Sequence, residues 1–89
     1  MLKKTVTIVN KLGLHARASA KFVSHASRYK SDIEVTKNNH TVNGKSIMGI
    51  MMLAAIQGTE LELTIEGVDE NAMMEDLQTL IDNRFGEAA

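Results

Sequence analysis

A histidine and an arginine stand two positions apart in the segment Gly13-Leu14-His15-Ala16-Arg17-Ala18. The segment joins an expected strand to an expected helix, where the first N–H groups of the helix lack partners and the helix dipole favours an anion. An imidazole is a nucleophile near neutral pH, and a guanidinium matches the oxygens of a phosphate group. The pattern therefore fits a phosphoryl group carried by His15 and stabilised by Arg17, with backbone donors from Ala16, Arg17 and Ala18. The residues alone leave open that His15 only caps the helix and that Arg17 is an ordinary surface residue.

A second candidate site is Gly44-Lys45-Ser46, which matches the end of the phosphate-binding loop pattern G-x-x-x-x-G-K-[ST]. The first glycine of that pattern would fall on Asn39, and the chain is too short for the domain that surrounds such a loop. A nucleotide hydrolase is therefore disfavoured. Ser46 is instead expected to cap the next helix, where its hydroxyl is also a candidate for regulatory phosphorylation.

The segment Ile47–Leu53 has no charged side chain and is predicted to form a short helix. A domain of this size cannot bury every side of such a helix, so part of it should be exposed. Flexible thioether side chains suit an adaptable docking surface, and the candidates for it are Ile47, Met48 and Met51. The alternative is a wholly buried helix in which methionine fills space.

The other residues that could do chemistry give weaker patterns. His25 and His40 are expected at the surface, because a metal site would require them to converge with His15 from different elements. No metal or cofactor is expected. The chain has only three aromatic side chains that could stack on bases, Phe22, Tyr29 and Phe85. Nucleic-acid binding is therefore not expected.

Hydrophobic periodicity predicts four strands and three helices. The expected strands are Thr5–Val9, Asp32–Lys37, His40–Val42 and Glu60–Glu66, and the expected helices are Ala16–Ser27, Ile47–Leu53 and a last helix capped by Asp69 and stopped by Gly86. Because apolar and polar residues alternate in Glu60–Glu66, one face of an antiparallel sheet should be in water and the helices should cover the other. Residues 1–89 are thus expected to form one two-layer α+β domain.

Two of the expected helices show an apolar stripe. In the first helix the stripe is Ala16, Ala20, Val23 and Ser27, with Phe22 and Ala26 beside it. In the last helix the stripe is Met73, Leu77, Leu80 and Ile81. These stripes are the faces expected to pack in the core.

Size and composition bound the functions open to the chain. It has 89 residues and no Cys, which leaves room for one modest domain and excludes disulfides and thiol chemistry. The longest apolar run, Ile47–Ile56, has ten residues, whereas a helix that spans a bilayer needs about 20. The N-terminus lacks the pattern of a signal peptide, so a cytoplasmic protein with no membrane association is expected.

The formal net charge of −1 hides an uneven distribution. Nine of the ten basic residues lie within residues 1–45, and nine of the eleven acidic residues lie within residues 46–89. Four of the basic residues are expected around the His15 loop and the start of the short helix: Lys11, Arg17, Lys21 and Lys45. We therefore expect a basic functional face whose partners are acidic.

Two motifs together resemble the HPr family, the histidine-containing phosphocarrier proteins of the bacterial phosphotransferase system. They are Gly13-Leu14-His15-Ala16-Arg17 and Gly44-Lys45-Ser46-Ile47-Met48, and they lie at the separation typical of the family. The resemblance covers essentially the whole chain. It implies an open-faced β-sandwich of order βαββαβα, with a four-stranded antiparallel sheet and three helices on one face.

The resemblance also implies a function for each candidate residue. His15 would accept a phosphoryl group on Nδ1 from phosphorylated enzyme I and pass it to an enzyme IIA, while Arg17 stabilises the group. Ser46 would be the target of HPr kinase/phosphorylase where that enzyme exists, and partners would dock on Ile47, Met48 and Met51. Such a protein is a monomeric carrier and not a free-standing enzyme. The rival hypothesis is a non-catalytic α+β interaction module in which His15 is incidental.

One position departs from many sugar-system members of the family. They have proline after the arginine, where this chain has Ala18. Alanine adds a backbone donor that proline lacks, and it leaves the role of His15 intact. With the run Lys45–Ala55 and the ending Asn83-Arg84-Phe85, this difference favours the proteobacterial branch, which includes the nitrogen-system carrier NPr. The sequence leaves both the sugar and the nitrogen branch open.

Overall fold

The structure is a computed structural model that describes residues 1–89. Its strands are β1 (Leu2–Thr7), β2 (Asp32–Lys37), β3 (His40–Asn43) and β4 (Glu60–Glu66). Its helices are α1 (Ala16–Ala26), α2 (Ile47–Met52) and α3 (Glu70–Asp82), and a short 3₁₀ helix, η1 (Arg84–Gly86), follows α3. None of these helices has the length and apolar character needed to cross a membrane.

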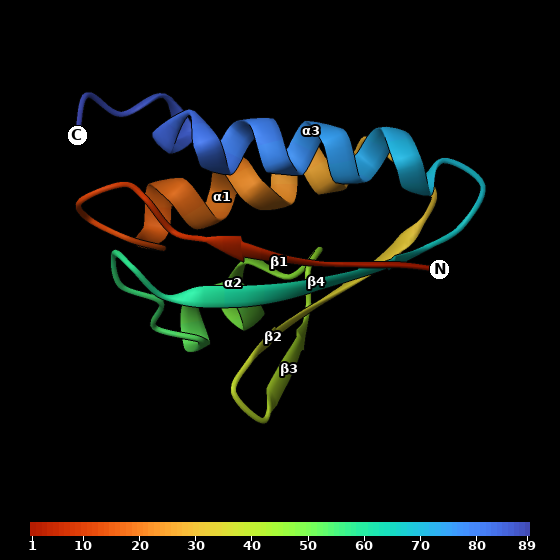
Figure 1. Ribbon diagram of the computed structural model, residues 1–89, viewed down its shortest axis with the longest axis horizontal. Coiled ribbons are helices and arrows are strands. Elements are labelled where there is room, and N and C mark those ends of the chain that lie inside the picture. Colours follow the sequence, from red (N-terminus) through yellow and green to blue (C-terminus); the bar gives the residue numbers. More distant parts are fainter.

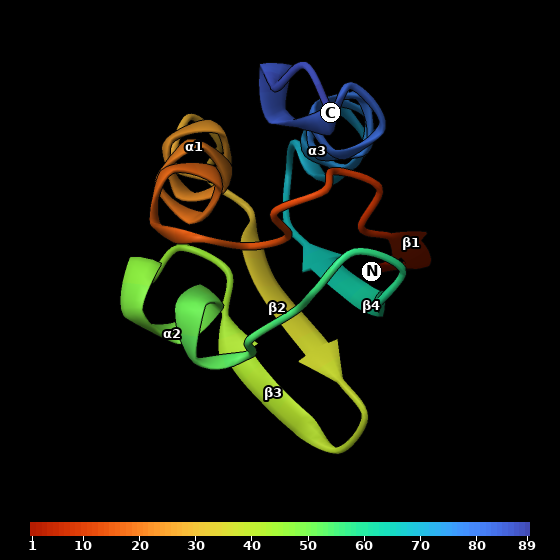
Figure 2. The same ribbon diagram turned by 90° about the vertical axis from the view of Figure 1, so that its left-hand side faces the viewer.

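The four strands form one antiparallel sheet in the order β1-β4-β2-β3. All three α-helices lie on one side of this sheet, and the other side is open (Figure 1, Figure 2). α1 and α3 lie side by side and run in opposite directions, while α2 packs against α1 and β3. The expected α+β architecture, an open-faced sandwich with three helices on one face, is confirmed.

The alternation in β4 places the centre of the core. Leu61, Leu63 and Ile65 are buried, whereas the glutamates of the same strand are exposed. β4 pairs with both β1 and β2, so these side chains lie in the middle of the sheet, under the helices. Burying an aliphatic side chain of this size stabilises a fold by about 1.5–3 kcal/mol.

The first strand differs from its predicted bounds. The β-branched run predicts Thr5–Val9, whereas β1 spans Leu2–Thr7. Pairing with β4 sets the observed bounds, because the ladder runs from Leu2 opposite Ile65 to Thr7 opposite Glu60. The partner strand, and not local propensity alone, decides where this strand begins and ends.

α1 buries a different stripe from the predicted one. The buried residues are Ala18, Ser19, Phe22 and Ala26, whereas Ala16 is exposed and Ala20 and Val23 are half-buried. The predicted stripe is wrong because it was chosen by counting small and apolar residues at helical spacing, without regard to the apolar area of each side chain. Phe22 offers the largest apolar area on the helix and is 1% exposed, so the helix is turned to place its ring in the core.

The stripe of α3 is confirmed at Met73, Leu77 and Ile81, all of which are buried. Both predicted end signals act differently from expectation. Asp69 is at the N-cap position, but its carboxylate makes no capping bond to α3. Gly86 does not end α3, which stops at Asp82; it belongs to η1, where it has a φ of +77°.

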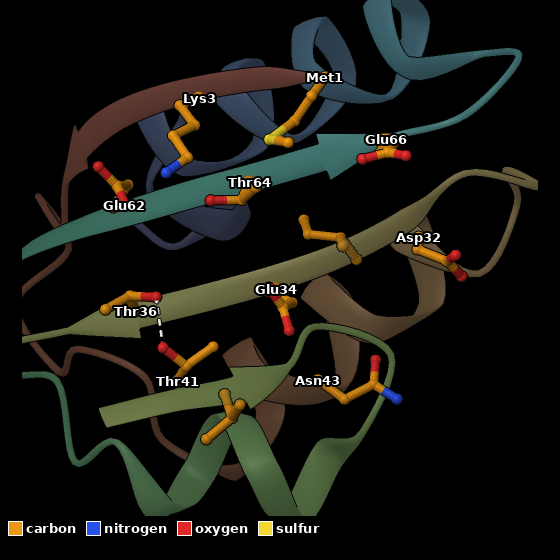
Figure 3. Close-up of a pocket in the computed structure, with 12 residues that line it drawn as sticks. Met1, Lys3, Asp32, Glu34, Thr36, Thr41, Asn43, Glu62, Thr64 and Glu66 are labelled. Carbon is orange, nitrogen blue, oxygen red and sulfur yellow. Dashed lines mark hydrogen bonds between the residues drawn. The ribbon is translucent and has the colours of Figure 1, made fainter. Parts of the chain in front are cut away.

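The open face of the sheet is polar and mostly acidic. Figure 3 shows Lys3 there among the side chains of four acids, Asp32, Glu34, Glu62 and Glu66. The only hydrogen bond between side chains of this face joins Thr36 and Thr41 at 2.9 Å. These residues surround a broad open hollow to which no helix contributes.

Candidate functional site

The loop between β1 and α1 places His15 at the start of α1. Gly13 has a φ of +68°, and a Cβ at this position would lie 2.4 Å from the carbonyl oxygen of Ala55. Only glycine therefore fits here. The N–H of Leu14 donates to the same oxygen at 2.9 Å. The loop is thus fixed against the segment that follows α2, and His15 becomes the N-cap of α1.

His15 presents its two ring nitrogens to different partners. Nδ1 accepts a long hydrogen bond, 3.3 Å, from the backbone N–H of Arg17. Nε2 contacts the carboxylate of Glu87. The imidazole is 29% exposed, so another protein can reach it. The structure therefore brings His15 together with the N–H groups at the start of α1.

Glu87 reaches His15 from the segment after η1, 72 residues further along the chain. The side-chain amide of Asn10 donates to Glu87 Oε1 at 3.0 Å and to the carbonyl oxygen of Gly13 at 2.9 Å. Burial raises the pKa of the Glu87 carboxyl, but the hydrogen bonds from Asn10 and His15 lower this pKa more, so it lies below its usual value. Glu87 is therefore an ionised acceptor at neutral pH.

Arg17 lies next to His15 and has no acidic partner. Its side chain is exposed and makes no ion pair. An open hollow of about 660 Å³ adjoins it, lined by Lys11, Leu12, His15, Ala16, Arg17, Glu87, Ala88 and Ala89. An anion in this hollow would have a guanidinium, an ammonium group and helix N–H donors as neighbours.

Two of the four bases expected around the site donate hydrogen bonds to backbone carbonyl oxygens. Lys21 donates its ammonium group to the carbonyl oxygen of Phe85 at 2.6 Å, and Lys45 donates to that of Tyr29 at 2.7 Å. Lys21 thus links α1 to η1, and Lys45 links the segment before α2 to the segment after α1. Of the four expected bases, Lys11 and Arg17 line the hollow beside His15.

Ser46 caps α2 as expected, because its Oγ accepts a hydrogen bond from the N–H of Gly49 at 3.0 Å. The apolar side chains of α2 are largely exposed: Ile47 by 43%, Met48 by 72%, Met51 by 40% and Met52 by 78%. Ile50 alone in this helix is fully buried. The alternative of a wholly buried helix is therefore wrong, and Met52 extends the exposed group that the sequence suggested.

The exposed surface of α2 is connected to His15 through the Gly13–Ala55 contact. Ile56, next to Ala55, has its Cα 3.0 Å from where a Cβ on Gly13 would lie. Ile56 is 72% exposed and Leu12 is 69% exposed, so apolar surface continues from α2 toward the His15 loop. We call this region the site face and define it by half-buried His15 and seven exposed residues: Leu12, Arg17, Ile47, Met48, Met51, Met52 and Ile56.

Sequence reasoning missed Asn10 and Glu87. Neither residue belongs to a spacing pattern with His15, and Glu87 follows the last helix among residues that predict no structure. Asn10 is fully buried. A polar residue in an apparent loop is expected to be exposed, so this burial could not be predicted from the sequence. Only the folded chain brings the two residues to the ring of His15.

Comparisons with known proteins agree with this fold. A family model described as "PTS HPr component phosphorylation site" matches residues 2–83. Phosphocarrier protein HPr of Neisseria meningitidis is 59% identical over 87 residues, which cover 98% of both chains. The crystal structure of HPr-C-His from Thermoanaerobacter tengcongensis matches with a TM-score of 0.96 and 48% identity, covering 100% of both chains. A crystal structure of an HPr dimer from that organism matches with a TM-score of 0.79 and 49% identity, covering 98% of this chain and 100% of that one.

Proposed function

The chain belongs to the HPr family of phosphocarrier proteins of the phosphotransferase system, and we propose that it carries a phosphoryl group on His15. Phosphorylated enzyme I donates the group to Nδ1 of His15, and an enzyme IIA accepts it. The chain is a carrier and not a free-standing enzyme, and it needs no cofactor. It acts as a cytoplasmic monomer that binds neither membranes nor nucleic acids.

The observation that carries this proposal is the orientation of the His15 ring at the start of α1. Nδ1 lies 3.3 Å from the backbone nitrogen of Arg17, a long hydrogen bond that a phosphoryl oxygen can replace. The N–H groups of Ala16, Arg17 and Ala18 have no partner within the helix, so they are donors for a group attached to Nδ1. The helix end thus supports transient negative charge on His15.

The guanidinium of Arg17 acts in both transfers. Phosphoryl transfer spreads negative charge over the oxygens of the moving group, and catalysis consists mainly of positioning and of stabilising that charge. Arg17 is exposed and has no carboxylate to satisfy it, so it can turn toward the phosphoryl oxygens. The partner protein supplies the remaining groups of the transfer site.

Partners dock on α2 beside His15, mainly on Ile47, Met48 and Met51. Exposed thioether and aliphatic side chains form an adaptable surface for several partners, which a carrier requires. A phosphate on Ser46, added by HPr kinase/phosphorylase where the cell has one, would place negative charge beside this surface. Docking of acidic partners would then weaken through like-charge repulsion.

The direct test is the intact mass of the protein after incubation with enzyme I and phosphoenolpyruvate. We expect a gain of one acid-labile phosphate in the wild type, none in His15→Ala and a normal gain in His25→Ala. His25 is a matched control because it lies on the same helix and is half-buried. Label retained on His15→Ala would contradict the proposal. A wild type that gains no phosphate would favour the non-catalytic interaction module.

A second experiment decides between the sugar and nitrogen branches. The phosphorylated protein is mixed with one enzyme IIA from each branch, and loss of phosphate from His15 is followed over time. The faster acceptor identifies the branch, because docking complementarity sets the rate of productive encounters.

A further inference from the structure

We propose that Glu87 is a positioning residue that holds the proton of His15 on Nε2 and so leaves the Nδ1 lone pair to the phosphoryl group. The proposal rests on the phosphoryl-carrier function proposed above. It concerns Nε2, the ring nitrogen that contacts Glu87, and not Nδ1, which accepts from the backbone N–H of Arg17.

The two contacts of the ring require the same tautomer. The Arg17 N–H is a donor, so Nδ1 must be the acceptor and carry no proton. An ionised carboxylate is only an acceptor, so the nitrogen that contacts Glu87 must be the protonated one. One edge of the ring is thereby set as donor, and the other is set as nucleophile.

Glu87 is itself held in place. The buried side chain of Asn10 donates to its Oε1, and the remaining N–H of that amide is used by the carbonyl oxygen of Gly13. The backbone is fixed on both sides of Glu87. Before it, Phe85 is buried and its carbonyl oxygen accepts from Lys21; after it, the Ala89 backbone oxygen accepts from the N–H of Lys11 at 3.1 Å. A carboxylate so anchored fixes the orientation of the ring it touches.

The location of the proton matters for both transfers. When His15 accepts the group, the Nδ1 lone pair forms the N–P bond, and the donor's bond to phosphorus breaks with its electron pair leaving on the donor. The ring then carries positive charge with its proton still on Nε2, and Glu87 balances that charge. When the group moves on, the N–P pair returns to Nδ1 and neutral imidazole departs. A ring without the Nε2 proton would have to leave as an anion, which is a much poorer leaving group.

The test compares Glu87→Gln and Glu87→Asp with Glu66→Gln, a control that removes an exposed acid from the open sheet face. Ring-nitrogen NMR of the unphosphorylated protein reports which nitrogen of His15 is protonated. We expect a hydrogen-bonded Nε2–H in the wild type and in Glu66→Gln, a mixed population in Glu87→Gln, and partial recovery in Glu87→Asp. Phosphoryl transfer to and from His15 should slow about tenfold in Glu87→Gln and remain unchanged in Glu66→Gln.

The proposal would be overturned if Glu87→Gln showed the same ring-nitrogen shifts and transfer rates as the wild type. It would also be overturned if His15 of the wild type were protonated on Nδ1, and this second result does not depend on the folding of any variant. A wild type that takes no phosphate overturns the carrier function and the transfer role together. The nitrogen shifts report the Glu87 contact by themselves, so the two failures are distinguishable.

Discussion

A carboxylate lies at each end of the α1–α3 pair, and the two ends differ in the polar groups that remain without a partner. At one end Asp69, before α3, accepts hydrogen bonds from the N–H groups of Lys30 and Ser31, both at 2.9 Å, and from the Ser31 hydroxyl. At the other end Glu87, after α3, accepts from Asn10 and contacts His15. Each carboxylate ties one end of α1 to one end of α3.

The two ends differ in how much hydrogen-bonding capacity remains. Around Asp69 the donors are satisfied, and the hydrogen bonds from the Ser31 hydroxyl and from backbone N–H groups, chiefly that of Lys30, lower the pKa of Asp69 to about 2. Around Glu87 the Nδ1 atom of His15 has only a 3.3 Å bond, Arg17 has no acidic partner, and the buried Oδ1 atom of Asn10 has none at all. The satisfied end stabilises the fold, whereas the other end keeps groups available for a ligand.

Removing Arg17, the cation without an acidic partner at the His15 end, should change the transfer rate most. Arg17→Ala should slow phosphoryl transfer by about 100-fold, because the charge of the moving group loses a principal stabilising contact. Arg28→Ala, two residues beyond the end of α1 and also exposed, should leave the rate unchanged. Rapid-quench transfer assays measure both. Equal rates for the two variants would mean that the ends do not differ in function.

Alanine substitutions at Gly13, near Glu87, and at Gly67, near Asp69, should both lower the stability of the fold, but only one of them should slow phosphoryl transfer. A Cβ on Gly13 would lie 2.4 Å from the Ala55 oxygen, and a Cβ on Gly67 would lie 2.4 Å from Ser31 Oγ. Both substitutions should cost about 1–3 kcal/mol in urea unfolding. Only Gly13→Ala should also slow transfer, because it displaces the His15 loop. Gly58→Ala controls for the positive φ, since no atom lies within 4 Å of a Cβ there.

A change at Ser46, beside the site face, should have a smaller effect that is confined to binding. Ser46→Asp keeps a side chain that can cap α2, so the free energy of unfolding should barely change. The added charge beside Met48 should weaken enzyme I binding by about tenfold, or 1.4 kcal/mol. Titration calorimetry measures the affinity. Wild-type affinity would contradict a docking role for α2.

The smallest effect concerns Asp69, at the other end of the α1–α3 pair, and it is present at neutral pH and lost in acid. Asp69 has a folded pKa of about 2 against an ordinary value of 3.8. Its contribution to stability is therefore complete above the ordinary value and is lost as the pH falls toward 2. The wild type should be more stable than Asp69→Asn at pH 7, and urea titrations should show this difference disappearing between about pH 5 and pH 2. A difference that does not vary with pH would contradict the role of ionised Asp69.

How much of the fold could be predicted varied from element to element. The bounds of β2 and β4 are as predicted, because their alternation reflects one buried and one wet face. The predicted bounds of β1 differ from the observed ones because the register of β1 depends on β4, which lies more than fifty residues further along the chain. The predicted buried stripe of α1 was wrong because helical spacing gave Phe22 no more weight than the neighbouring alanines.

The parts of the site that are adjacent in the chain could be predicted from local sequence patterns. His15, Arg17 and the start of α1 fall within a few residues, and Ser46 precedes the helix that it caps, so local rules of capping and turns place them. The groups that hold the Nε2 edge of His15 depend instead on the packing of distant segments. Asn10 and Glu87 are 77 residues apart, and their contact depends on α3 packing antiparallel to α1. That packing is driven by burial of apolar area, which no local spacing around His15 encodes.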